Sequence, residues 1–112
     1  MSNSILRDKA KEFAKNIVFL CRNMKSEHKE TVLINQLLRS GTSIGANIHE
    51  AQYAQGTKDF ISKLEIAQKE CYETEYWLEL LFETWYRTNL IQGNSKRLWS
   101  YTQNVNCIVK YD

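Results

Sequence analysis

The 112-residue sequence contains no proline, only four glycines and no long run of apolar residues. Without proline, no position removes a backbone N–H or clashes with the preceding helical turn, so long helices can run uninterrupted. No apolar stretch approaches the roughly 18 to 20 residues that a membrane-crossing helix needs. The N-terminal segment carries charge early and lacks a continuous apolar stretch, so we expect no secretory signal. The net charge is only +2, which by itself does not predict nucleic-acid binding.

Cysteine is also scarce. The three cysteines, Cys21, Cys71 and Cys107, are far apart, and no pair has the CxxC spacing of a zinc ribbon or a thioredoxin-like motif. An odd number of cysteines without an expected signal peptide is typical of reduced thiols, so we predict a cytoplasmic protein. We interpret all three as small apolar residues of the core.

Apolar residues recur at helical spacing along almost the whole chain. With 43% hydrophobic and 25% charged residues, the composition is typical of a soluble globular protein, and the length fits one domain, 1–112. The periodicity predicts four helices, at about 4–24, 30–55, 57–88 and 93–110. Because the links between them are short, we expect an all-α, antiparallel, up-down-up-down four-helix bundle.

Charge is distributed unevenly between these predicted helices. Residues 1–29 hold seven bases and three acids, whereas residues 57–88 hold four bases and seven acids. One interpretation is that these are solvated faces that also attract each other within the bundle. The other is a basic surface for RNA or DNA, which copies of the chain would multiply. The candidate nucleic-acid-binding residues are Arg7, Lys9, Lys11, Lys15 and Arg22.

The second predicted helix carries small residues beside a polar stripe. Gly41 and Gly45 each cost a helix roughly 1 kcal/mol relative to alanine, which close approach of another helix would offset. That neighbour is either within the bundle or in a second subunit. The polar stripe lies next to the apolar stripe and is either an ordinary solvent face or part of a buried network that needs partners. The predicted network comprises Ser43, Asn47, Glu50, Glu70 and Glu73.

The second half of the third predicted helix is apolar around its whole circumference. One bundle core uses only one stripe of such a helix, so the remaining surface predicts burial against something else. Another copy of the chain is the simplest candidate, because interfaces favour Trp and Tyr; an exposed ligand-binding patch is the alternative. The predicted interface residues are Tyr72, Tyr76, Trp77, Leu80 and Phe82.

Motifs for enzymatic chemistry are almost absent. The sequence has no phosphate-binding glycine motif, no HExxH and no paired Glu-x-x-His, so we expect no cofactor and no metal site. One pair, Arg22 and His28, resembles the Arg-(Asn)-x4-His element of the HEPN ribonucleases. There the histidine would act as acid or base and the arginine would stabilise charge at phosphorus. In that family the element lies late in the bundle, so we prefer a non-enzymatic protein and keep the ribonuclease as the alternative.

Three motifs between Leu37 and Leu81 resemble one known family. They are S-I-G-A-N-I-x-E at 43–50, F-x-x-x-L-x-I-A at 60–67 and E-x-x-E-x-E-Y-W-L at 70–78. As a set they are similar to the four-helix-bundle proteins encoded in intervening sequences of bacterial 23S ribosomal RNA genes, also labelled ribosomal-protein-S23-like. Gly41 and His49 stand where this family commonly has alanine.

The resemblance implies a bacterial four-helix bundle that assembles as a homo-oligomeric ring, a pentamer, and it implies no catalytic residues. A similar pentameric bundle, the accessory variability determinant of diversity-generating retroelements, binds nucleic acid and a reverse transcriptase. By that analogy the chain is expected to be an adaptor or scaffold for RNA, DNA or a nucleic-acid enzyme.

Overall fold

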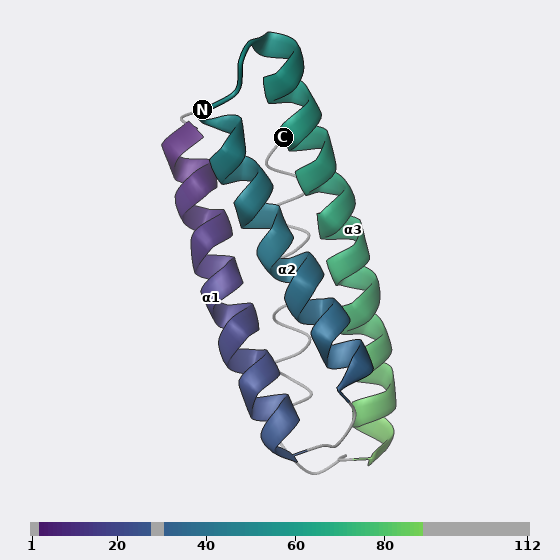
Figure 1. Ribbon diagram of the computed structural model, residues 1–112. Coiled ribbons are helices and arrows are strands. Elements are labelled where there is room, and N and C mark those ends of the chain that lie inside the picture. The colour runs from purple at the N-terminus through teal and green to yellow at the C-terminus, as the bar shows by residue number, and fades with distance from the viewer. Residues whose placement is uncertain (1–2, 28–30, 89–112) are drawn as a thin grey trace.

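Three helices form the part of the protein that the computed structural model describes, residues 3–27 and 31–88 (Figure 1). They are α1 (Asn3–Glu27), α2 (Val32–Ala51) and α3 (Thr57–Thr88). No strand occurs within these ranges, so the all-helical prediction is confirmed for them. The predicted fourth helix, 93–110, lies outside the described residues.

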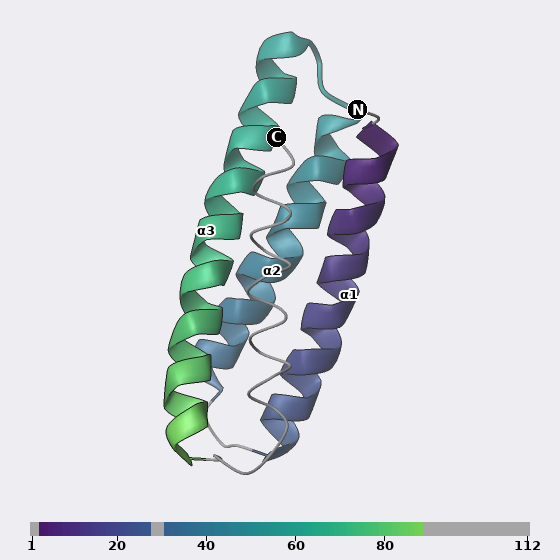
Figure 2. The ribbon, with the colours of Figure 1, turned by 180° about the vertical axis from the view of Figure 1, so that it is seen from behind.

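The three helices run side by side, with α2 between α1 and α3 in both views (Figures 1 and 2). Consecutive helices are antiparallel, as short connections require. α1 packs against α2 and α2 packs against α3, whereas the backbones of α1 and α3 do not approach each other closely. Each outer helix is therefore held in place mainly through α2 within the described ranges.

The core is a single cluster that joins the three apolar stripes. Burial of these side chains removes apolar surface from water and supplies most of the drive to fold. Its buried members follow the helical spacing seen in the sequence. They are Ala10, Phe13, Ile17, Leu20, Cys21, Met24, Ile34, Leu37, Ile44, Ile48, Ala67, Cys71, Leu78 and Leu81.

The two glycines of α2 mark its close approach to α1. A Cβ placed on Gly41 would lie 2.9 Å from Ile17 Cγ2, and one placed on Gly45 would lie 3.4 Å from the Ala10 carbonyl oxygen. The neighbour that offsets their helix-forming cost is thus α1 of the same chain. Of the two sequence-based interpretations, the structure supports packing within one bundle.

Two helix ends differ from the sequence expectation. α1 continues to Glu27, because no helix breaker follows the buried Met24, and the Ser26 hydroxyl donates to the Asn23 carbonyl at 2.7 Å. α2 ends at Ala51 rather than near residue 55. Beyond it, the Tyr53 amide donates to the Glu50 carbonyl and the Ala54 amide to the Ala51 carbonyl, in tighter bonds that turn the chain toward α3.

Candidate functional site

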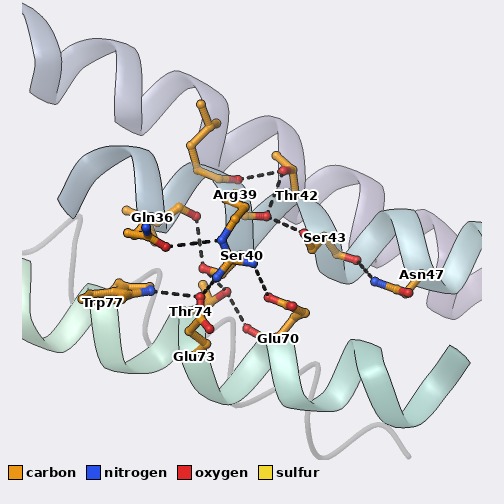
Figure 3. A network of polar contacts seen from close by, with 12 residues as sticks. Gln36, Arg39, Ser40, Thr42, Ser43, Asn47, Glu70, Glu73, Thr74 and Trp77 are labelled. Atoms are coloured by element: carbon orange, nitrogen blue, oxygen red, sulfur yellow. Dashed lines mark hydrogen bonds and ion pairs between the residues drawn. The ribbon is translucent and has the colours of Figure 1, made fainter. Parts of the chain in front are cut away.

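A polar seam runs between α2 and α3 and includes a fully buried pair of hydroxyls (Figure 3). The Thr74 hydroxyl donates to Ser40 Oγ at 2.9 Å, and Ser40 Oγ lies 3.3 Å from the Leu37 carbonyl oxygen. Thr74 Oγ1 also lies 2.7 Å from the Glu70 carbonyl oxygen. Both side chains are 0% exposed. Each buried hydroxyl therefore has partners, as polar groups in a core require.

The exposed edge of the same seam is an ion cluster around Arg39. Arg39 Nη1 lies 3.3 Å from Glu70 Oε2, and Arg39 Nη2 pairs with Glu73 Oε2. Trp77 Nε1 donates to the same Glu73 oxygen at 3.2 Å. Because the Arg39 side chain is 47% exposed, solvent screens this cluster, and we assign it a role in holding α2 against α3 rather than in chemistry.

The five residues of the predicted buried network lie in three different places. Glu70 and Glu73 contact Arg39 across the seam. Ser43 and Asn47 are partly buried, but their side chains donate to carbonyl oxygens of their own helix, at 2.7 and 2.8 Å. Glu50 is exposed and pairs with Lys63 at 3.2 Å.

The residues that complete the seam were not among those five. Arg39, Ser40 and Thr74 each lie on the α2–α3 side of their helices. Ser40 belongs to the polar stripe visible in the sequence, and Thr74 stands alone among apolar residues at core spacing. A lone threonine in an apolar stripe was the available signal for a buried partner.

A second feature is an exposed stripe on α3, on the side turned away from α2. Its aromatic members, Tyr72 and Tyr76, are 54% and 57% exposed. Ile61 is also exposed, and three exposed acids that make no ion pair within residues 5–27 and 31–84 alternate with these residues along the helix. We call this set the α3 outer stripe: Ile61, Glu65, Tyr72, Tyr76, Glu79 and Glu83.

The other predicted interface residues do not belong to the α3 outer stripe. Trp77 and Phe82 pack partly against the core, and Trp77 also faces the Arg39 cluster. Leu80 is half-buried. Tyr76 and Trp77 are in edge-to-face contact, with ring centroids 5.2 Å apart, which links the stripe to the seam.

The basic residues of α1 gather on one exposed side, with one exception. At about 100° per residue, Arg7, Lys11, Lys15 and Arg22 fall within a quarter turn of one another, whereas Lys9 lies on the other side of the helix. Lys25 falls on the shared side as well. We call this set the α1 basic stripe: Arg7, Lys11, Lys15, Arg22 and Lys25.

The ribonuclease alternative depends on a residue outside the described ranges. Arg22 is exposed, and its guanidinium carbon lies 5.9 Å from the centroid of the exposed Phe19 ring. His28 is not among the described residues, so the predicted Arg22–His28 pairing stays a prediction. Within residues 3–27 and 31–88, no cluster of three His, Cys, Asp or Glu side chains is suited to a metal ion. In the same part of the chain, no helix is long and apolar enough to cross a membrane.

Cys21 has a clearly shifted pKa. Its thiol is buried between α1 and α2, with Sγ 3.6 Å from the Ile34 carbonyl oxygen. Burial raises the pKa of the Cys21 thiol from 9.0 to about 11, against the opposing charge of Lys25. The thiol is thus held protonated and unreactive near neutral pH.

We expect the free energy of unfolding to fall as the pH rises from about 9 to 11. In this window the unfolded thiol loses its proton while the folded thiol keeps it, so stability declines by at most about 1.4 kcal/mol per pH unit. Urea unfolding of the wild type and of Cys21→Ala across this range measures the effect. The variant should show the shallower decline; equal declines would contradict the assignment.

Comparisons with known proteins identify a family and a similar solved structure. Residues 2–103 match the family model described as 23S rRNA-intervening sequence protein. The fold is similar to a crystal structure from Bacteroides thetaiotaomicron, described as a protein of unknown function from the S23 ribosomal protein family. The two share 48% sequence identity and a TM-score of 0.84, over 98% of this chain and 93% of the other. No curated protein matches the sequence significantly.

Proposed function

This chain belongs to the 23S rRNA-intervening sequence protein family, and on that premise we propose that it is a non-enzymatic protein that acts by assembling with copies of itself. The observation that carries the proposal is the α3 outer stripe. Tyr72 and Tyr76 are more than half exposed, although large aromatic side chains contribute most when buried. Exposed aromatic residues aligned on one helix face are typical of an interface.

The mass of the protein in solution tests assembly. A single chain has a mass of 13.2 kDa, and we expect light scattering to give a multiple of it; the proposed pentamer would have about five times that mass. Substituting Tyr72→Ser together with Tyr76→Ser should lower the mass and leave the helical circular dichroism intact. Tyr53→Ser is the matched control, because Tyr53 is 75% exposed but lies outside the stripe. A wild-type protein of 13 kDa at all concentrations would overturn the proposal.

The non-enzymatic part of the proposal has a separate test. Incubation with structured RNA should leave the RNA intact. Cleavage that is lost in both Arg22→Ala and His28→Ala would instead support the HEPN-like ribonuclease, whose chemistry needs both groups.

A second candidate function is an adaptor for RNA, DNA or a nucleic-acid enzyme. It is favoured by the alignment of five exposed cationic side chains in the α1 basic stripe, which copies in an assembly would repeat. Retention of structured RNA on a filter should then fall steeply as salt is added. No retention even at low salt would remove this candidate.

A further inference from the structure

The α1 basic stripe and the α3 outer stripe occupy opposite sides of the molecule. Both lie on the exposed sides of their helices, and α2 separates the two helices (Figures 1 and 2). One stripe is cationic, and the other combines aromatic rings with carboxylates. A surface and its complement on opposite sides of one chain are suited to a head-to-tail contact between copies.

Contacts inside the chain show which residues of α1 and α3 lie at the same height. Ile17 contacts the site of Gly41, and the adjacent Ser40 bonds Thr74, so Ile17 is level with Thr74, 57 positions later. Ala10 lies beside Gly45 in the same way, and Glu50 pairs with Lys63. Gly45 lies five residues before Glu50 on α2, and α3 is antiparallel to α2, so Gly45 is level with the residue five positions after Lys63, which is residue 68. Ala10 is therefore level with residue 68, 58 positions later.

The same offset matches charges of opposite sign. Arg22 is level with Glu79, and Lys25 is level with Glu83. Within residues 5–27 and 31–84, none of these four side chains makes an ion pair.

The same offset places further residues of the α1 basic stripe level with residues of the α3 outer stripe, near one end and in the middle. Arg7, which contacts Asp8 at 3.6 Å, is level with Glu65. Between the charged pairs, Lys15 is level with Tyr72, where a cation and an aromatic face attract each other. Lys11 is the exception, because the offset sets it level with Gln68 and the exposed Lys69. The other four cations of the α1 basic stripe stand opposite a carboxylate or a ring of the α3 outer stripe.

We propose that the α1 basic stripe of one copy binds the α3 outer stripe of the next copy. This inference rests on the proposed self-assembly and names the second surface it requires. Rotation about an axis along the helices leaves every residue at its height, so Arg22 meets Glu79 and Lys25 meets Glu83 of the neighbour. Such a contact closes into a ring when the rotation between neighbours divides a full turn. The α1 basic stripe then binds the next copy of the chain rather than a nucleic acid.

Charge reversal on each stripe tests the proposal. Arg22→Glu/Lys25→Glu and, separately, Glu79→Lys/Glu83→Lys should each weaken assembly at least about tenfold, because like charges then face each other. Sedimentation over a range of protein concentrations measures the dissociation constant, and circular dichroism checks that the helices persist. At high salt, the dissociation constants of the charge-reversed variants should lie closer to that of the wild type, because salt screens the repulsion.

Restoring complementarity gives the decisive control. The chain that carries all four substitutions has the wild-type net charge and should assemble again. Mixing the two double variants should restore assembly in part, because each presents the stripe that the other needs, although a ring of five leaves one junction between like variants. Recovery in both experiments supports head-to-tail pairing of these two stripes.

The possible failures are distinguishable. If the tyrosine substitutions break the assembly but neither charge reversal does, self-assembly stands and this inference is overturned. If Arg22→Glu/Lys25→Glu abolishes RNA retention and leaves the mass unchanged, the α1 basic stripe binds a polyanion and the inference is likewise overturned. If the wild type is a single 13 kDa species, the proposed function and the inference fail together.

Discussion

Ile17→Ala is expected to lower the free energy of unfolding by about 2 to 5 kcal/mol. Ile17 is 0% exposed and packs at the point where α1 and α2 come closest. Removal of its side chain loses buried apolar surface and leaves a cavity that two rigid helices cannot fully close. Urea unfolding followed by helical circular dichroism, at one fixed protein concentration, measures the loss.

Gly41 should be coupled to Ile17 in a double-mutant cycle. Gly41→Ala alone adds a Cβ 2.9 Å from Ile17 Cγ2, and the strain should exceed the roughly 1 kcal/mol that alanine contributes to a helix. In the Ile17→Ala background the same change fills space and should stabilise. Gly45→Ala is the control, because its Cβ makes ordinary contacts and should stabilise the wild type by up to about 1 kcal/mol. Equal effects of Gly41→Ala in both backgrounds would contradict this account of the contact.

Arg39→Glu is expected to lower the free energy of unfolding by about 1 to 2 kcal/mol. The substitution places a third carboxylate beside Glu70 and Glu73 and removes the cation that both now contact. The effect is limited because the site is partly exposed, and it should shrink as salt is added. Urea unfolding at low and high salt measures both the size of the loss and its screening.

Two further variants separate charge from packing at this site. Arg39→Gln removes the cation without adding repulsion, so its loss should be the smaller one. Arg39→Glu combined with Glu73→Arg restores opposite charges across the seam and should recover part of the stability. A singly substituted Arg39→Glu protein as stable as the wild type would show that the cluster does not hold α2 to α3.

The helices could be predicted from sequence because their signal is local. Apolar residues three and four positions apart define one face of a helix whatever that face contacts. The resemblance carried by the motifs in 43–78 independently implied a helical bundle. The end of α2 was harder to place, because Gln52 to Gln55 contain no strong helix breaker and the turn depends on bonds formed with α3, such as that between the Gln55 amide and Asp59 at 3.2 Å.

The polar seam could be predicted only in outline. The sequence placed a polar stripe beside the core but could not show which members reach α3. Ser43 and Asn47 bond carbonyls of their own helix, an option that these side chains always have and that periodicity does not reveal. The pairing of Ser40 with Thr74 and of Arg39 with Glu73 depends on the relative height of two helices, which is a tertiary property.

The α1 basic stripe shows the difference between counting charges and placing them. Five basic residues of the first helix were grouped because they lie in one segment, yet Lys9 is nearly half a turn away from Arg7. Lys25 belongs on the same face and was left out. The angle of each residue around the helix, rather than the number of charges in the segment, decides which cations a partner meets.

The position of α2 between its neighbours has a consequence for motion. Its backbone is shielded by α1 on one side and α3 on the other, whereas each outer helix rests mainly on α2 within the described ranges. When α1 detaches, the α2–α3 pair stays packed. When α3 detaches, the α1–α2 pair stays packed. Amide protons in the middle of α2 should therefore exchange with deuterium only when both openings occur together, and more slowly than those at equivalent depths of α1 or α3.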